Sequence, residues 1–392
     1  MTDSATGFGR AFPPGFLFGA AVSAHQVEGG NDNDWTAWEP GHVPEVSGAA
    51  VDHYHRYRED LRLAASLGLD AFRFSVEWAR VEPRPGVYDP DALQHYSDVV
   101  DACRELGLEP MITLNHFTLP RWVATAGGWS APEVAERFGI YCGVVGQALR
   151  GRVESVCTLN EPEVLSMKTC LAGVWPGGGR LAVRRYLRVR RGLADGHRLA
   201  TAALRQADSR FSIGYCCSQN PFVATTSVLE PVARAASRLY NDWFLDRLTP
   251  TCDWLGVQYY NRVAVGPRRG PDVPRSDMGW PLVPELHGPV LESLSRYGLP
   301  LYVTESGLAD ADDSRRTWYI EATLRSLAEA LTAGVDVRGY LHWSLLDNYE
   351  WDHGFGPRFG LVEVDRRTME RRVRASARRY AELIDTIRHA HA

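Results

Sequence analysis

Eight short apolar runs recur along the 392-residue chain, and each precedes a stretch with the periodicity of an amphipathic helix. The predicted strands span 16–21, 71–75, 110–114, 153–159, 211–215, 254–260, 300–304 and 337–343. The predicted helices lie near 53–67, 91–106, 132–149, a long region ending near 206, 230–248, 283–297, 314–333 and 372–387. Alternating strands and helices form a parallel sheet. Eight such units without a long linker predict one α/β domain over residues 1–392, a single (β/α)8 TIM barrel.

An open, doubly wound sheet is the structural alternative, since it is built from the same repeated unit. Such sheets usually carry a glycine-rich phosphate-binding turn after the first strand. Here neither GxGxxG nor GxxxxGK[ST] follows that strand, and the run 177–179 of three glycines falls in a loop that matches no phosphate cradle. The closed barrel is therefore the favoured architecture.

Charge and composition exclude several classes of partner. The chain is 45% hydrophobic and 23% charged, with a formal net charge of −5, so nothing attracts it generally to nucleic acid or anionic membranes. The one dense basic run, Arg184–Arg191, alternates with apolar residues and is typical of a solvated helix face. The segment Met1–Pro14 resembles neither a signal peptide nor a membrane span. Seven cysteines without a CxxC pair favour a reducing compartment, and we expect a cytoplasmic protein.

Polar side chains gather at the predicted carboxyl ends of the strands, where TIM-barrel active sites lie. Glu161 follows the fourth strand and Glu305 ends the seventh, so the two carboxylates should face each other across the barrel mouth. Amide, imidazole, phenol and indole groups would surround them. This set suits an uncharged, polyhydroxylated ligand, which needs many hydrogen bonds and a flat stacking surface. The strand ends carry Gln26, Glu28, Arg73, Glu77, Trp78, Asn115, His116, Asn160, Tyr260, Trp343, Asp347, Glu350 and Trp351.

A metal site is the alternative for two facing carboxylates. Magnesium and calcium gather more oxygen ligands than this, and zinc prefers histidine or cysteine. His53 and His55 are two residues apart in a helical pattern, so they point to different faces. We therefore predict no metal and give this histidine pair a structural role. Glu77 is expected to be an ion-pair or loop partner, and Glu28 and Asp347 are expected to organise loops.

Six motifs in order resemble those of glycoside hydrolase family 1, whose members are retaining β-glycosidases. They are FLFGAAVSAHQVEGG at 16–30, LNHFTLPRW at 114–122, TLNEP at 158–162, YVTESG at 302–307, GYLHWSLLDNYEW at 339–351 and RFGLVEVD at 358–365. NEP alone would be a weak signal. All six in order, spread over nearly the whole chain, make a chance resemblance very improbable.

This resemblance implies a role for each matching residue. Glu161 would be the general acid/base and Glu305 the nucleophile, with the carboxyl groups about 5–5.5 Å apart as retention requires. Arg73 and Tyr260 match the positions that hold the nucleophile, and Trp343 matches the platform under the sugar ring. The glycone hydroxyls would be bound by Gln26, His116, Asn160, Glu350 and Trp351. No cofactor is implied, and the partner is a small-molecule β-glycoside.

The last motif block also bears on the charge of the sugar. The 6-phosphoglycosidases of the family carry serine, lysine and tyrosine there to bind phosphate. This chain has Glu350, Pro357 and Phe359 at the matching positions. A carboxylate at Glu350 would repel a phosphate dianion, so the resemblance implies a neutral sugar.

Four residues depart from the family pattern. Ser306 and Gln258 stand where asparagine is usual, which should alter the hydrogen bonding of the nucleophile loop. Phe117 and Glu163 replace frequent aromatic residues and should alter the sugar and aglycone walls. The segments after Leu248 and Glu305 are also short, which predicts an open aglycone side that favours bulky or aryl aglycones over long oligosaccharides.

Two other functions stay open at this point. A transglycosylase would pass the glycosyl group to an acceptor other than water, and it shares the same covalent intermediate as a hydrolase. A noncatalytic sugar-binding barrel belongs to another class, and it should have lost one carboxylate. Both carboxylates are present here, so hydrolysis of β-glucoside-, β-galactoside- or β-fucoside-type substrates is the leading hypothesis.

Overall fold

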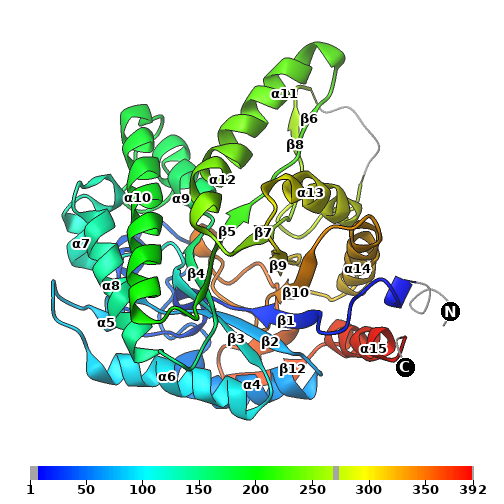
Figure 1. The fold of residues 1–392 in the computed structure, drawn as a ribbon, viewed down its shortest axis with the longest axis horizontal. Helices are drawn as coiled ribbons and strands as arrows, with labels where there is room; N and C mark the ends of the chain where they lie inside the picture. The colour runs from blue at the N-terminus through cyan, green and yellow to red at the C-terminus, as the bar shows by residue number, and fades with distance from the viewer. Residues whose placement is uncertain (1–7, 268–272, 391–392) are drawn as a thin grey trace.

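The computed structural model describes residues 8–267 and 273–390, and within them eight parallel strands close into a barrel (Figure 1). These strands are β1 (Leu17–Ala21), β2 (Ala71–Ser75), β3 (Glu109–Asn115), β4 (Ser155–Asn160), β5 (Ser212–Ser218), β7 (Trp254–Gln258), β9 (Leu301–Ser306) and β10 (Val337–Trp343). Their order around the barrel is β1-β10-β9-β7-β5-β4-β3-β2. The ring closes where β10 pairs with β1, in a register that joins Leu17 to Gly339. The predicted TIM barrel is confirmed.

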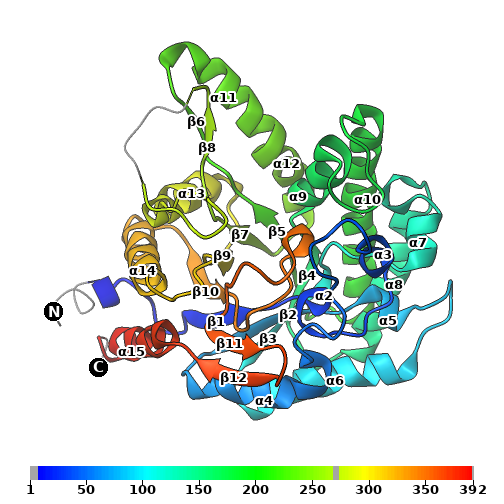
Figure 2. The same ribbon diagram turned by 180° about the vertical axis from the view of Figure 1, so that it is seen from behind.

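Helices surround the barrel, as the amphipathic patterns predicted (Figures 1 and 2). They are α4 (His53–Ser66), α6 (Pro90–Glu105), α8 (Val134–Ala148), α10 (Val183–Ala207), α11 (Glu230–Ser237), α12 (Trp243–Leu248), α13 (His287–Leu294), α14 (Arg316–Thr332) and α15 (Ala375–His389). The helix predicted at 230–248 is interrupted by a π-helical turn over Arg238–Asp242. Two small sheets were not predicted, because strands of three or four residues show little periodicity. One joins β6 (Phe222–Ala224) to β8 (Val263–Val265), and the other joins β11 (Val362–Asp365) to β12 (Glu370–Val373).

The barrel interior changes from apolar to polar toward the carboxyl ends of the strands. Met111, Cys157, Cys216, Trp254 and Leu341 come from five different strands and pack into one buried cluster, which they can do only inside the barrel. Two residues further along β3, the Thr113 hydroxyl accepts a hydrogen bond from Arg73. The apolar cluster thus forms the floor on which the polar groups of the barrel mouth rest.

Buried polar contacts fix the loops around that mouth. Glu28 accepts hydrogen bonds from an arginine of α5 (Trp78–Val81) and from Tyr96. Asp347 accepts from both terminal nitrogens of Arg374, at 2.9 Å each, which ties the segment after β10 to the start of α15. Glu77 accepts from the Thr118 hydroxyl at 2.9 Å. The predicted loop-organising roles of Glu28, Asp347 and Glu77 are confirmed, although Glu77 forms no ion pair with a described residue.

The predicted histidine pair behaves as a structural element of α4. His53 is buried and bonds to Asp60 at 2.8 Å, whereas His55 is exposed and pairs with Asp52. Asp60 also accepts from Arg371 of β12, so this contact anchors α4 to the hairpin. Among the described residues, no group of three or more histidine, cysteine or carboxylate side chains is arranged to hold a metal ion.

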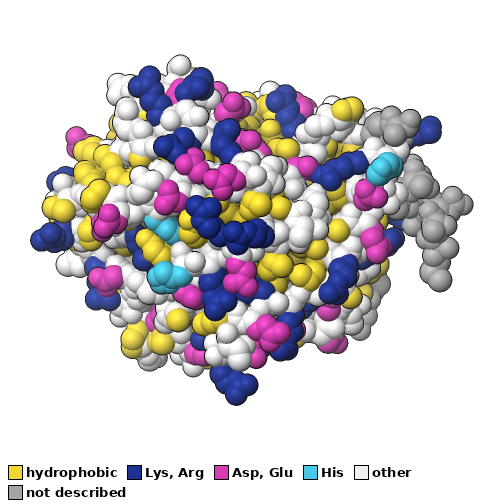
Figure 3. Space-filling model, turned by 90° about the horizontal axis from the view of Figure 1, so that it is seen from below, with side chains coloured by type: hydrophobic (Ala, Val, Ile, Leu, Met, Phe, Trp, Pro, Cys, Tyr) yellow, Lys and Arg dark blue, Asp and Glu magenta, His cyan; other side chains and the backbone are white. Residues whose placement is uncertain are grey.

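The basic run lies on α10, and most of its arginines face solvent as predicted. Arg190 differs, because its guanidinium is 1% exposed and lies 3.9 Å from the ring centroid of Trp243. On the face shown in Figure 3, Lys/Arg and Asp/Glu side chains are intermingled rather than segregated. No helix in residues 8–267 and 273–390 has the length and apolarity needed to cross a membrane. All seven cysteines lie in these ranges, and each is buried with a free thiol.

Candidate active site

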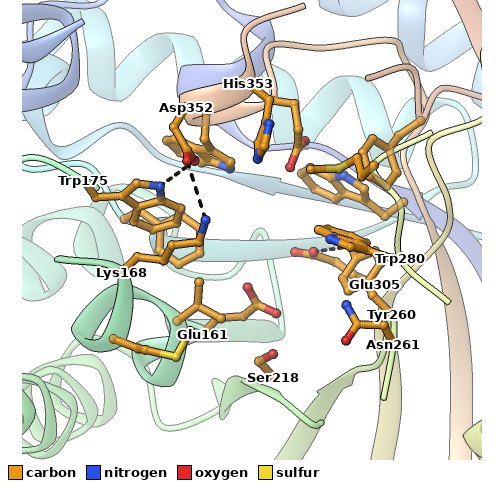
Figure 4. A pocket seen from close by; sticks show the side chains of 18 of the residues that line it. Glu161, Lys168, Trp175, Ser218, Tyr260, Asn261, Trp280, Glu305, Asp352 and His353 are labelled. Carbon is orange, nitrogen blue, oxygen red and sulfur yellow. Dashed lines mark hydrogen bonds and ion pairs between the residues drawn. The ribbon is translucent and has the colours of Figure 1, made fainter. Parts of the chain in front are cut away.

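A pocket of about 190 Å³ opens at the carboxyl ends of the barrel strands. Most residues expected at the site line it, namely Gln26, His116, Glu161, Tyr260, Glu305, Trp343, Glu350 and Trp351. Arg73 and Asn160 are the other two, and they lie just beneath, in hydrogen-bond contact with residues of the pocket wall. Figure 4 shows that Glu161 and Glu305 enter this pocket from different sides. The tertiary structure therefore brings all ten expected side chains together.

The backbone is strained at three positions around the pocket. Phe117, Glu161 and Trp351 have φ values of +75°, +40° and +48°, a region that residues with a side chain rarely adopt. Each such residue costs of order 1–3 kcal/mol, and strain of this kind clusters at functional sites. Close packing adds a further constraint, since a Cβ atom on Gly307 would lie 1.8 Å from the carbonyl oxygen of Trp343. The fold thus holds these three side chains in place at a cost in local stability.

Two donors and a close amide surround the Glu305 carboxylate. Arg73 Nη1 donates to Oε1 at 2.5 Å, and the Tyr260 hydroxyl donates to Oε2 at 2.8 Å. Burial raises the pKa of Glu305, while Arg73, Tyr260 and Gln258 oppose that rise by stabilising the ionised form. Burial and the neighbouring carboxylates also raise the pKa of Tyr260, so its phenol keeps the proton that it donates. These contacts favour an ionised Glu305.

Glu161 has the opposite environment. It is 8% exposed and forms no ion pair with a described residue. Burial, followed by the charges of Glu305 and Glu163, raises the pKa of Glu161 well above its ordinary value. When two buried carboxyls interact, the one without a cation keeps the proton. The cation beside Glu305 therefore favours the charge on Glu305 and the proton on Glu161.

A chain of hydrogen bonds holds Arg73, the cation that distinguishes Glu305 from Glu161. Arg73 is fully buried, and its other nitrogens donate to Asn160 Oδ1 at 2.6 Å and to Thr113 Oγ1 at 3.0 Å. Gln258 donates to the same Asn160 oxygen at 2.9 Å. The Asn160 amide in turn bonds to His116 Nε2, which leaves the imidazole proton on Nδ1. That Nδ1 atom is buried and has no hydrogen-bond partner among the described residues.

The far side of the pocket carries an amide–carboxyl pair, in which Gln26 is buried and Glu350 is half-buried. Gln26 Nε2 donates to Glu350 Oε2 at 3.3 Å and to two acceptors on the preceding segment. Burial and the charge of Glu305 raise the pKa of Glu350 to about 8. Trp351 and Trp343 flank the pair in the pocket wall. Such a surface offers donors, acceptors and indole faces, with no cation directed at the ligand.

The four departures from the expected pattern have different outcomes. Ser306 bonds to His287 at 2.8 Å, and Gln258 contributes to the Asn160 network, so both take part in the hydrogen bonding around Glu305. Phe117 lines the pocket and packs against Trp351, with ring centroids 5.1 Å apart. The expectation for Glu163 is wrong, because its side chain is only 2% exposed and lies outside the pocket wall. It turns inward because the Ser218 backbone N–H offers a hydrogen bond there.

Comparison with known proteins decides the family. The model for "Glycosyl hydrolase family 1" matches residues 9–251 and 255–388. The chain belongs to glycosyl hydrolase family 1. It is a glycoside hydrolase of the β-glucosidase type, as the ordered motifs predicted.

Full-length relatives of this family 1 enzyme carry related names. The chain is 34% identical to "Thermostable beta-glucosidase B" of Thermobispora bispora, over 95% of this chain and 90% of that protein. It is 31% identical to the "Bifunctional beta-D-glucosidase/beta-D-fucosidase" of Bifidobacterium breve, over 92% of this chain and 95% of that one. A solved β-glycosidase from Pyrococcus horikoshii superposes with a TM-score of 0.89 at 35% identity, covering 96% and 95% of the two chains.

Several residues of the pocket in this family 1 enzyme were not predicted. They are Val164, Met167, Lys168, Trp175, Ser218, Asn220, Tyr240, Asn261, Met278, Trp280, Asp352 and His353. Two signals could have found some of them. Ser218 ends a barrel strand, and Lys168 is the only lysine of the chain. Lys168 lies 3.6 Å from Asp352 and over the ring of Trp175 (Figure 4).

Met278 and Trp280 occupy the side where the short loop after Glu305 leaves room. They come from the segment 273–283, which no local pattern placed near the pocket. This segment bonds to the loop through Asp277, whose backbone N–H donates to Ala309 and whose carboxylate accepts from the Ala311 N–H. The pocket therefore has a wall beside the loop after Glu305 that the loop lengths alone did not predict.

Proposed function

We propose that this enzyme hydrolyses β-glycosides of neutral sugars with retention, using Glu161 as general acid/base and Glu305 as nucleophile. One observation carries the assignment: Arg73 donates to Glu305 at 2.5 Å, whereas no described cation pairs with Glu161. A nucleophilic carboxylate must be ionised and a general acid must be protonated. The two buried carboxyls differ in the sense that these roles require.

The proposed reaction has two displacements. The Glu305 carboxylate attacks the anomeric carbon while Glu161 passes its proton to the glycosidic oxygen, so the aglycone leaves as an alcohol and a glycosyl ester forms. Glu161 is then a carboxylate, and it takes a proton from water. That water attacks the anomeric carbon and breaks the ester bond, which releases the sugar with its original configuration and restores both carboxyls.

The rest of the pocket supports a neutral glycone. We assign hydroxyl binding to Gln26, His116, Asn160, Glu350 and Trp351, and the ring platform to Trp343. The unpartnered His116 Nδ1 donor suits an oxygen of the sugar. Lys168 is the only lysine or arginine that lines the described pocket, and it pairs with Asp352, which offsets its charge toward a sugar phosphate. The names of the relatives agree with glucose-type and fucose-type sugars.

Glu161→Ala tests the acid/base assignment. Turnover of glycosides with poor leaving groups should fall by roughly 100–10,000-fold, the usual contribution of general acid catalysis, and activated aryl glycosides should lose far less in the first step. Azide should restore turnover of activated substrates and yield a β-glycosyl azide. Glu163→Gln is the matched control, because it changes a nearby buried carboxyl outside the pocket and should keep the wild-type leaving-group dependence. Equal losses for all leaving groups without azide rescue would assign the acid elsewhere.

Glu305→Ala tests the nucleophile separately. Hydrolysis of every β-glycoside should be abolished, because no group can form the glycosyl ester. The variant should still couple an α-glycosyl fluoride to an added sugar acceptor, since Glu161 is intact. Near-wild-type hydrolysis by Glu305→Ala would refute the proposal, while coupling without hydrolysis would support it.

A further inference from the structure

A second cavity of about 430 Å³ lies beside the sugar pocket, and nothing in the proposed reaction uses it. Its volume falls within the range of about 300–1,000 Å³ that is typical of small-molecule sites. Its wall is mostly apolar, with a few polar groups. The residues that line it are Asp34, Ala37, Trp38, Phe117, Leu119, Arg121, Ala124, Thr125, Gly128, Trp129, Leu165, Thr169, Pro176, Gly177, Arg185 and Val189.

One helical segment separates the two spaces. It consists of α9 (Pro162–Met167) and the π-helical turn η2 (Lys168–Ala172) that continues it. Met167 and Lys168 face the sugar pocket, whereas Leu165 and Thr169 face the second cavity. π-Helical turns are rare and often mark functional sites. The cavity is thus a separate space that shares a partition with the catalytic site.

Aromatic surfaces make the cavity suitable for a flat ring. Trp38, Phe117 and Trp129 line it, and Phe117 and Trp129 are 3% and 4% exposed. The indole Nε1 of Trp129 is buried and has no hydrogen-bond partner within residues 8–267 and 273–390. A buried donor without an acceptor is costly, so a ligand acceptor that reached it would gain a hydrogen bond.

The cavity also carries a guanidinium that no carboxylate neutralises. Arg185 forms no ion pair with a described residue, and its Nη2 reaches only the Gly127 carbonyl at 3.5 Å. Its Nε is buried, and no described residue forms a hydrogen bond with it. The second arginine of the wall, Arg121, is already paired with Asp32 at 2.6 Å. Arginine binds carboxylates through two parallel hydrogen bonds, so Arg185 supplies a specific anchor for an acid.

Asp34 is the only carboxyl among the described residues that line the cavity, and it does not prevent an anion from binding there. Asp34 accepts a hydrogen bond from the Leu119 backbone N–H. Burial, partly offset by this bond, raises the pKa of Asp34 to about 7. Below that pH its carboxyl is mostly neutral and does not repel a negative ligand.

We infer that the second cavity is a binding site for a small aromatic carboxylic acid, with the ring among the three aromatic side chains and the carboxylate on Arg185. The site also contacts the sugar pocket through Phe117, which lines both spaces and lies with its ring centroid 4.9 Å from that of Trp175. Occupancy of the cavity therefore changes the packing behind the sugar wall, without overlapping the sugar.

The test measures binding of 2-naphthoate to the whole protein by calorimetry at about pH 6, with neutral 2-naphthylmethanol as the comparison. We expect saturable 1:1 binding of naphthoate. Arg185→Gln should weaken the binding of naphthoate by roughly 10–100-fold, the usual contribution of a hydrogen bond to a charged group. The affinity for naphthylmethanol should not change. Arg184→Gln is the matched control, because it removes the same charge from an exposed neighbour outside the cavity.

Two further measurements place the ligand. Ala124→Phe should fill the cavity and abolish binding of both probes while hydrolysis of an aryl β-glucoside continues. The second measurement uses Glu305→Gln with an aryl β-glucoside bound in the sugar pocket. As the glucoside concentration rises, the affinity for naphthoate should change up to a limiting value, and naphthoate should stay bound. Complete displacement by the glucoside would overturn the inference, as would an absence of saturable binding up to about 10 mM or equal affinities of the Arg185 and Arg184 variants.

Discussion

Arg73→Met removes the cation beside Glu305 and is the sharpest test of how the two carboxyls divide their roles. Arg73 is fully buried and donates to Glu305 at 2.5 Å, so little solvent screens this pair. An adjacent cation lowers a carboxyl pKa by about 1–3 units. Methionine fills the same space without charge, and Glu305 would then keep its proton to a pH about 1–3 units higher.

The assay is the pH dependence of kcat/KM for a strongly activated aryl β-glucoside, whose leaving group needs little help from Glu161. The acidic limb then reports ionisation of the free nucleophile. We expect this limb to move up by about 1–3 pH units, so that activity well below it falls about 10–1,000-fold. Tyr260→Phe removes a neutral donor at 2.8 Å from the other Glu305 oxygen and should shift the limb by less. An unmoved limb in Arg73→Met would refute the view that this cation keeps the nucleophile ionised.

The stability of the Arg73→Met variant should also depend on the protonation of Glu305. In Arg73→Met, Glu305 binds its proton more tightly in the folded than in the unfolded chain, so the variant loses stability as pH rises from about 4.3 to the raised folded pKa. The cost should approach about 3–5 kcal/mol above that pKa, the usual penalty for an unpaired buried charge, and should be smaller in acid. Denaturant unfolding at several pH values measures it. A deficit that grows toward low pH would contradict the reasoning.

Four further outcomes are expected. A neutral β-glucoside should be hydrolysed faster than its 6-phosphate, because the Glu350 carboxyl lines the described pocket while Lys168, its only lysine or arginine, is paired with Asp352, and the reverse order of kcat/KM would contradict this. Aryl glycosides with fused-ring aglycones should exceed cello-oligosaccharides in kcat/KM, since Trp280 offers one stacking wall, and a steady rise with oligosaccharide length would be the opposing result. Lys168→Met should lower kcat/KM for glucosides by up to about 5-fold, because a half-exposed ion pair is worth about 0–1 kcal/mol, and a loss above about 100-fold would mean that Lys168 acts in the reaction itself. Asp60→Asn leaves the buried Arg371 without its carboxylate and should cost about 3–5 kcal/mol at neutral pH. Burial raises the pKa of Asp60, but contacts with His53 and Arg371 outweigh it and lower this pKa. The cost of Asp60→Asn should therefore shrink as pH falls below about 3.9 and the wild-type carboxylate is protonated. A cost that does not depend on pH would count against this ion pair.

The barrel and its catalytic candidates were predictable because both are written in local patterns. A buried parallel strand needs a short apolar run, and each of the eight runs became a barrel strand. Because the carboxyl ends of parallel strands meet at one rim, residues as far apart as Gln26 and Glu350 could be expected in one pocket before any contact was known.

The different electrostatic environments of the two carboxyls depend on tertiary contacts. Glu161 and Glu305 have the same side chain, and the difference between them comes from Arg73, which is 232 positions from Glu305 in the chain and reaches only one of them. Glu163 shows the same limit: its position after the NEP motif suggested the aglycone wall, but a backbone donor on β5 holds it inside. Such contacts depend on distances between distant segments, which local periodicity does not contain.

The sequence by itself determined a βα barrel with two carboxylates among polar and aromatic side chains at its mouth, because strand periodicity and motif order are properties of neighbouring residues. The tertiary structure alone decided which carboxyl has a cation beside it, which segments line the pocket, and that a second cavity lies behind Phe117. These properties arise where segments far apart in the chain pack together. Burial and hydrogen-bond partners there set charge and shape, and both exist only once the chain is folded.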